Sequence, residues 1–306
     1  LDPLSRSRTL AINSAATCFR SVIALGLMLF SSRWVLHALG MDDFGTYSVI
    51  ATLTASVTFL NGIFANSVAR HLAFAIGENK PGEVRRWFNT ALSLHVIVAI
   101  VLVALGWPLG RWFIEHHMTI APERLATVRL IFGFSLAGAF CTMVAVPYVA
   151  MFTAKQRLTE LAVIGIAQAV LIFALALSLR HTSSDLLRLY GLGMAAIVML
   201  MQTATAVRAL WLYSECSLVP SEWFNGQKTR EVLHFAGWNL FGGLGSILRD
   251  SGSAILLNLQ FGPSVNAAYG AANQVAQGSG QFALALVGAF TAEMTTSEGR
   301  GDRARM

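Results

Sequence analysis

Charged residues are scarce in this chain. Asp, Glu, Lys and Arg make up 12% of its 306 residues, whereas hydrophobic residues make up 55% and the mean hydropathy is +0.59. Soluble domains carry about a quarter charged residues, so this balance argues against a water-soluble globular protein. The sequence predicts a protein whose solvent is lipid.

Residues that build metal, disulfide or catalytic sites are also sparse. Cys18, Cys141 and Cys216 stand at unrelated spacings, which fits neither a disulfide framework nor a thiolate metal site. The adjacent histidines of EHH at 115–117 lack the i, i+4 spacing of a zinc-binding helix. The glycines at 242–245 lack the lysine of a phosphate-binding loop. We expect no metal, no cofactor and no enzymatic activity.

Long apolar runs separated by charges and turn residues fill the chain instead. A bilayer core of about 30 Å needs roughly 20 apolar residues per helix, and runs such as LHVIVAIVLVALGW favour helices over the alternating strands of a barrel. We predict an all-α, polytopic membrane helix bundle with helices near residues 10–38, 47–75, 87–114, 126–153, 160–180, 186–213, 231–260 and 265–293.

The basic residues are unevenly distributed between the two sides of this bundle. Most of the 22 Lys and Arg residues fall in connections on the side that holds the N-terminus. The positive-inside rule therefore predicts a multi-pass protein of the cell inner (cytoplasmic) membrane with a cytoplasmic N-terminus. Basic loops beside anionic lipid headgroups also account for the pI near 9.7, so membrane lipids and not nucleic acid are the expected partners.

An internal repeat is visible when the segment at 36–50 is laid on the segment at 257–271. LHALGMDDFGTYSVI and LNLQFGPSVNAAYGA each join two predicted helices, and the shift lays Gly40 on Gly262 and Tyr47 on Tyr269. The same shift superposes the first helix on the seventh and the second on the eighth. We predict one complete six-helix repeat followed by the first two helices of a second repeat in the same orientation.

A family likeness rests on these segments and on three others, namely the basic GENKPGEVRRWFNTAL, FAGWNLFGGLGSILRDSGSAILLN and GPSVNAAYGAANQVAQ. It resembles the polysaccharide and O-antigen flippases of the multidrug/oligosaccharidyl-lipid/polysaccharide exporter superfamily. The resemblance implies twelve to fourteen helices in two bundles, a cationic central cavity, a lipid-linked oligosaccharide as substrate and contact with polysaccharide polymerase machinery. We expect an N-terminal bundle at 1–213, a cytoplasmic linker at 214–230 and the start of a second bundle at 231–306. Because the chain begins with Leu1 and stops after the eighth helix, we expect it to be a fragment.

Arg249 and Asp250 lie together in the predicted seventh helix. A charge at a helix centre costs about 2.5–3.5 kcal/mol, so each needs a partner or water. Neighbours in a helix point about 100° apart and pair poorly, which leaves two arrangements: pairing with other helices in a sealed bundle, or lining a watered cavity. The family resemblance favours the cavity, with Arg249 binding anionic cargo and Asp250 as an ion-coupling group.

Arg20 in the first helix is the other deep charge, and it either binds cargo or extends its long side chain to the cytoplasmic headgroups. Polar stripes complete the predicted site. Asn273, Gln277 and Gln281 follow Asn266 on one face of the eighth helix, and Asn61 closes a similar stripe in the second helix. These amides either contact sugar hydroxyls in a cavity or bond neighbouring helices.

The leading hypothesis is a flippase that moves a polyprenyl-pyrophosphate-linked oligosaccharide across the membrane by alternating access between two bundles. One alternative is a drug or cation antiporter of the same superfamily, whose pocket should be acidic, whereas the deep charges here are mostly cationic. A second alternative is a membrane-embedded glycosyltransferase or acyltransferase acting on lipid-linked sugar. The third is a scaffold whose polar stripes are sealed from water.

Overall fold

The structure is a computed structural model that describes residues 3–58, 60–116, 120, 122–182, 185–234, 237–238, 241–242, 245, 290–291 and 293–301. Regular structure throughout these residues is helical, which confirms the predicted all-α class. Most of the predicted seventh and eighth helices lie outside the described residues. So do five of the predicted site residues, namely Arg249, Asp250, Asn273, Gln277 and Gln281.

The first two predicted helices are joined by a single residue. Helix α1 is continuous over Pro3–Thr58 except at Gly40, whose φ of 74° and ψ of 174° break the helical path, and α2 continues the second arm over Leu60–Gly77. The sequence pattern predicts a connection from 39 to 46. The structure needs no such loop because glycine adopts a positive φ without steric cost, and the second arm begins directly after it.

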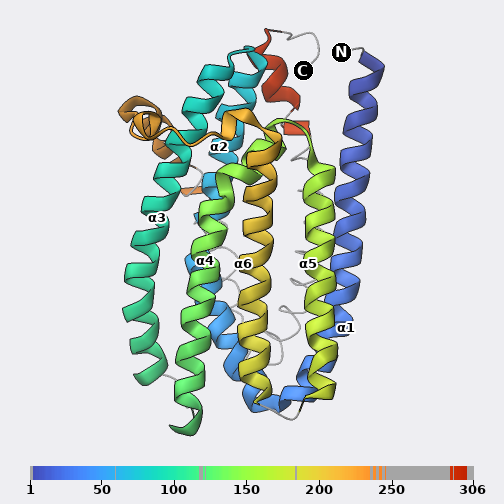
Figure 1. Ribbon diagram of the computed structural model, residues 1–306, viewed down its shortest axis with the longest axis vertical. Coiled ribbons are helices and arrows are strands. Elements are labelled where there is room, and N and C mark those ends of the chain that lie inside the picture. The colour runs from blue at the N-terminus through green and yellow to red at the C-terminus, as the bar shows by residue number, and fades with distance from the viewer. Residues whose placement is uncertain are drawn as a thin grey trace.

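The remaining helices alternate in direction between the two ends of the bundle (Figure 1). Five stretches are long and apolar enough to cross a membrane among the described residues, namely Ala11–Gly40, Pro81–His116, Pro122–Ala154, Leu158–His181 and Leu186–Leu212. The elements that follow α2 are α3 (Pro81–His116), η1 (Pro122–Arg124), α4 (Leu125–Ala154), α5 (Leu158–Ser178), η2 (Leu179–His181), α6 (Leu186–Leu212), η3 (Ser214–Cys216) and η4 (Pro220–Glu222).

Helix α4 forms the centre of this bundle. It packs against α6, α3, α2 and α1, and half of its most apolar stretch is buried, a larger share than in the other four candidate spans. Its packing is close because glycines accept large side chains: the ring of Phe132 lies over Gly110 of α3, and Ile131 lies over Gly191 of α6. A helix that is apolar on all sides belongs inside a bundle, and α4 is such a helix.

Ion pairs gather at both ends of the bundle. At one end Arg124 binds Asp43 at 2.8 Å and Asp185 at 2.6 Å, so it joins the start of α4 to the α1 kink and to the start of α6. The other end holds the connections around Lys80 and Lys155 and the segment after α6. We call it the basic end. The start of α1 and residues 293–299 both lie at the basic end (Figure 1).

Candidate functional site

Arg20 lies near the middle of the first arm of α1, nine residues or roughly 14 Å from the start of the membrane-spanning stretch at Ala11. Its side chain packs on α5, where a Cβ atom added to Gly165 would lie 2.6 Å from the Arg20 Cδ atom. The glycine therefore makes room for the arginine. No described carboxylate forms an ion pair with Arg20.

This depth distinguishes Arg20 from the other charged residues. Every other Asp, Glu, Lys or Arg in the described helices lies within seven residues of a helix end or of the Gly40 break, where a long side chain reaches water or headgroups. Arg20 is more than twice as far as that from both Pro3 and Gly40. A cation at this depth is costly, and such residues mark ion or substrate pathways by default.

Asn61 points elsewhere. It lines a small cavity of about 10 Å³ together with residues of α3 and α4, and no described group donates a hydrogen bond to its Oδ1 atom. This cavity has room for about one water molecule and is far smaller than a sugar ring. Arg20 faces α5 and Asn61 faces α3 and α4, so the described structure does not bring these two predicted site residues together. A role of Asn61 in binding sugar stays a prediction.

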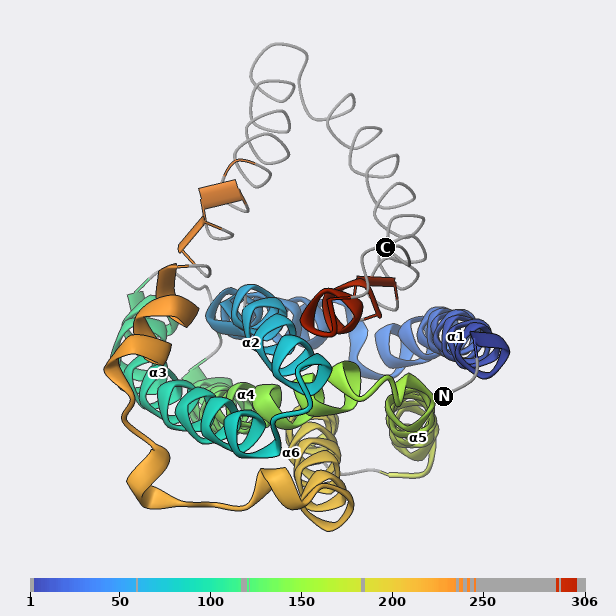
Figure 2. The same ribbon diagram turned by 90° about the horizontal axis from the view of Figure 1, so that it is seen from above.

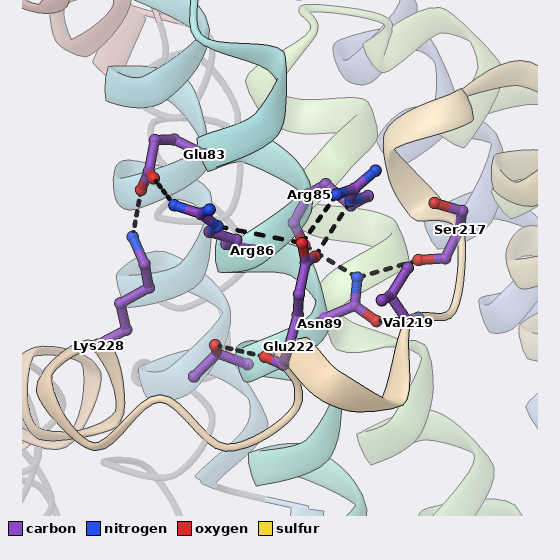
Figure 3. Close-up of polar contacts among 9 residues, drawn as sticks. Glu83, Arg85, Arg86, Asn89, Ser217, Val219, Glu222 and Lys228 are labelled. Carbon is purple, nitrogen blue, oxygen red and sulfur yellow. Dashed lines mark hydrogen bonds and ion pairs between the residues drawn. The ribbon is translucent and has the colours of Figure 1, made fainter.

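The segment after α6 is held along α3 by a buried polar face (Figure 3). The Asn89 amide donates to the Ser217 carbonyl at 2.9 Å and accepts from the Val219 amide at 2.9 Å. Asn89 and Thr90 are completely buried, and Thr90 donates to the Glu222 carbonyl at 3.3 Å. A buried amide that satisfies two backbone groups fixes the path of the chain it contacts.

Ion pairs reinforce this attachment. Arg85 binds Glu222 through two hydrogen bonds of 2.8 and 3.1 Å, and this bonding lowers the pKa of the Glu222 carboxyl. Farther along, Lys228 binds Glu83 at 2.5 Å (Figure 3). We call the contacts of Arg85, Asn89 and Thr90 with residues 217–222 the linker clamp.

A second junction at the basic end joins α2 to residues 293–299. The two segments touch backbone to backbone: a Cβ atom added to Gly77 would lie 2.9 Å from the Gly299 Cα atom and closer still to the Thr296 carbonyl oxygen. In return, a Cβ added to Gly299 would collide with the Phe74 carbonyl oxygen. Seen from above, residues 293–299 lie between α2 and α1 (Figure 2). We call this contact the basic-end seam.

The seam is reciprocal in a way that bears on the predicted repeat. The shift that lays Gly40 on Gly262 also lays Gly77 on Gly299 and Phe74 on Thr296. In the predicted repeat Gly77 corresponds to Gly299, and Phe74 corresponds to Thr296. Gly77 contacts Thr296 and Gly299 contacts Phe74, so the same contact is made once in each direction. A two-fold axis between two related halves produces such a contact, in which residue i touches j and j touches i.

Hydrogen bonds extend the seam toward α5. Gln156, in the connection between α4 and α5, donates to Glu293. The Gln156 carbonyl accepts from the Asn13 side chain at 2.6 Å, and Asn13 accepts from Thr159 at 3.1 Å. Residues of α1, α5 and the last described segment thus share one network. The sequence pattern did not indicate these residues, because Asn13 and Gln156 belong to no polar stripe.

No sequence-family model matches the chain, and no curated protein matches it. Its fold is similar to the outward-facing conformation of a multidrug resistance MATE family transporter of the MOP superfamily, with a TM-score of 0.78 and 13% identity over 97% of this chain. A mutant of a Vibrio cholerae MATE transporter is similar with a TM-score of 0.78 and 14% identity, over 98% of this chain and 68% of its own. The fold is also similar to a MOP superfamily transporter from Pyrococcus furiosus, with a TM-score of 0.73 and 10% identity over 95% of this chain and 65% of its own. That transporter is described as having a binding pocket of reverse polarity.

The protein is therefore a multi-pass membrane protein with the fold of MOP superfamily transporters. The chain spans 66% of the length of the first of these structures. The likeness shows the fold of the superfamily that the sequence resembles, and the three similar structures are described as transporters. At such low identity the likeness establishes the fold alone, so the cargo has to be inferred from this chain's own residues.

Proposed function

We propose that the protein is a flippase that moves a polyprenyl-pyrophosphate-linked oligosaccharide across the cytoplasmic membrane for polysaccharide export. The observation that carries the proposal is the depth of Arg20. A guanidinium binds phosphate oxygens through two parallel hydrogen bonds, and in a membrane interior with no described carboxylate partner it favours anionic cargo. Arg249 and the amides Asn273, Gln277 and Gln281 are the further proposed cargo contacts.

The same charge separates this proposal from its nearest rival. A drug antiporter that expels cationic amphiphiles needs a negative interior, and within the described helices no Asp or Glu lies as deep as Arg20. Pocket polarity is also a variable property of this fold, since the Pyrococcus furiosus neighbour is described by its reverse polarity. The drug antiporter remains the second candidate because Asp250 is predicted near the midpoint of the seventh helix.

Alternating access supplies the proposed mechanism. We place the basic end in the cytoplasm of an inner-membrane protein, as the positive-inside rule predicts. The basic-end seam then closes the cytoplasmic side, as expected for an outward-facing arrangement such as that of the similar MATE structure. Parting of Gly77 from Gly299 would admit cargo from the cytoplasmic leaflet. Asp250 is the proposed ion-coupling group.

The test is replacement of Arg20 by glutamine in the full-length protein, in cells that depend on it for surface polysaccharide. Glutamine keeps hydrogen-bonding capacity and removes the charge. We expect at least a tenfold fall in polymer at unchanged protein level, because one charge-assisted phosphate contact is worth about that factor. Arg33→Gln, in the same arm of α1 but exposed and only seven residues before the Gly40 break, is the matched control. Normal polymer output with Arg20→Gln would remove the residue from the mechanism.

A further inference from the structure

Two neighbouring hollows lie at the basic end, where α2 meets helical residues 226–234. The first has a volume of about 410 Å³ and is lined by Arg70, His71, Phe74, Arg230, Glu231 and His234. The second, of about 620 Å³, is lined by Phe224, Gly226, Thr229, Arg230, Leu233 and His234. Because Arg230 and His234 line both, the hollows are adjoining parts of one groove. We call it the basic-end groove.

Basic side chains dominate the first hollow. Arg70 and Arg230 come from different helices and His71 and His234 flank them, whereas Glu231 is the one carboxylate among the lining residues. Glu231 is engaged by Gln227 of its own helix at 3.2 Å. The two arginines give the hollow a net positive charge, which suits a phosphate or diphosphate group.

Neighbouring residues fix the wall of this hollow. The Trp87 ring of α3 stacks on His71 with 4.3 Å between centroids, and Lys228 Nζ lies 4.2 Å from the Trp87 centroid. Lys228 is held there by its ion pair with Glu83. The wall of the hollow is therefore a fixed stack, and α3 contributes to positioning His71.

The second hollow has a different chemistry. Phe224 is 76% exposed and Leu233 is 45% exposed, so both offer hydrocarbon surface beside the basic hollow. The exposed surface continues along the same segment, where Trp238 is 68% exposed and Phe241 is 74% exposed. A ligand that fills both hollows must be an amphiphile, with an anionic head and an apolar chain.

The depth of the groove agrees with such a ligand. Arg70 lies seven residues before the end of α2 at Gly77, or roughly 10 Å along the helix axis. The headgroup region of a bilayer is about 5–8 Å thick on each side of its hydrocarbon core. An arginine this close to the end of its helix extends its long side chain toward the headgroup phosphates.

We propose that the basic-end groove is the loading site at which the lipid-linked cargo first docks. Its diphosphate lies between Arg70 and Arg230, and its polyprenyl chain lies along Phe224 and Leu233. This inference rests on the proposed function, because it locates the first contact of the same cargo. The groove lies between α2 and residues 226–234, so docking occurs beside the basic-end seam that must open.

The experiment measures binding of a radiolabelled long-chain polyprenyl diphosphate to the full-length protein in nanodiscs of neutral lipid. Arg70→Gln and Arg230→Gln should each weaken binding about tenfold, because each removes one charge-assisted contact to phosphate. Arg208→Gln is the matched control, since Arg208 lies at the same end outside the groove and pairs with Glu160. Circular dichroism and thermal unfolding confirm that each variant is folded.

Competition identifies the occupant. Unlabelled polyprenyl diphosphate should displace the label, whereas inorganic diphosphate, neutral polyprenol and phosphatidylglycerol should compete at least tenfold less well. The exposed Phe224 tolerates substitution, and Phe224→Ala should weaken binding of the long-chain lipid while leaving a short-chain diphosphate unaffected. Equal competition by phosphatidylglycerol overturns the cargo assignment in favour of bulk anionic lipid, and equal competition by inorganic diphosphate overturns the amphiphile assignment.

The loading site and the proposed function fail separately. If Arg70→Gln and Arg230→Gln bind the lipid as tightly as the unaltered protein, the loading site is wrong while transport by the protein can still be measured. If the unaltered protein moves no lipid-linked oligosaccharide between leaflets but still binds polyprenyl diphosphate in the groove, the flippase proposal is wrong and the binding site stands as a lipid site.

Discussion

Replacing Gly77 by alanine should separate α2 from residues 293–299 at the basic end. The new Cβ atom would lie 2.9 Å from the Gly299 Cα atom and closer to the Thr296 carbonyl oxygen, where ordinary contact begins at 3.4 Å. Both obstacles are backbone atoms of a helical segment, so no side-chain rotation relieves the overlap. The two segments must therefore move apart, by about 0.5 Å to relieve the Gly299 contact and by more to relieve the nearer Thr296 contact.

The energetic consequence falls on the closed arrangement alone. Overpacking of a close contact costs about 1–3 kcal/mol, and an arrangement in which the segments have already parted does not carry this cost. A cost of about 2 kcal/mol, the middle of this range, shifts the equilibrium between the closed and open arrangements roughly 30-fold toward the open basic end. Alanine also favours helix over glycine by up to about 1 kcal/mol, but this gain applies to both arrangements.

Pulsed electron–electron double resonance measures this shift directly. Spin labels at Asn79→Cys and Arg300→Cys, in a background in which Cys18, Cys141 and Cys216 are replaced, report the separation across the seam. With Gly77→Ala the distance distribution should gain a longer component. Gly82→Ala, where no atom lies within 4 Å of the added Cβ, should leave it unchanged. Identical distributions for Gly77→Ala and the unaltered protein would refute the seam.

Two further predictions concern the linker clamp and the deep cation. Because the hydrogen bond to Arg85 lowers the pKa of Glu222, the carboxylate stabilises the clamp above its ordinary pKa, and this contribution is lost as the pH falls through the lowered value. Glu222→Gln, which mimics the protonated acid, should raise protease cleavage within residues 214–225 several-fold at pH 7; an unchanged cleavage rate contradicts the clamp. Gly165→Ala should displace the side chain of Arg20 and reduce polysaccharide output several-fold at constant protein level, whereas Gly26→Ala, in open space on the helix of Arg20, should not. Equal output from the two variants would show that the position of Arg20 is unimportant.

Helix positions were predictable from the sequence because the bilayer demands long apolar runs. The predicted helices at 126–153 and 186–213 match Leu125–Ala154 and Leu186–Leu212 to within one residue at each end. The start of the second arm was missed because Asp42 and Asp43 read as a loop. In the structure these residues open a helix after Gly40, where acidic side chains are favoured by the helix dipole.

Contacts between distant segments were not predictable in the same way. In the sequence Asn89 and Thr90 are two polar residues within an apolar helix. Only the folded chain shows that they bind the segment after α6. Gly77 and Gly299 carry no individual signal either. Their separation along the chain equals that of Gly40 and Gly262 in the predicted repeat, and only the folded chain shows that they lie in contact.

The most direct test of the account is a leaflet-crossing assay with the full-length protein in sealed vesicles. A lipid-linked oligosaccharide labelled on its sugar is placed in both leaflets, and its access to an external glycosidase is followed alongside that of a cationic amphiphilic dye. We expect protein-dependent movement of the anionic lipid, lost with Arg20→Gln and kept with Arg33→Gln. Movement of the cationic dye instead, with the lipid-linked sugar left in its original leaflet, would contradict it.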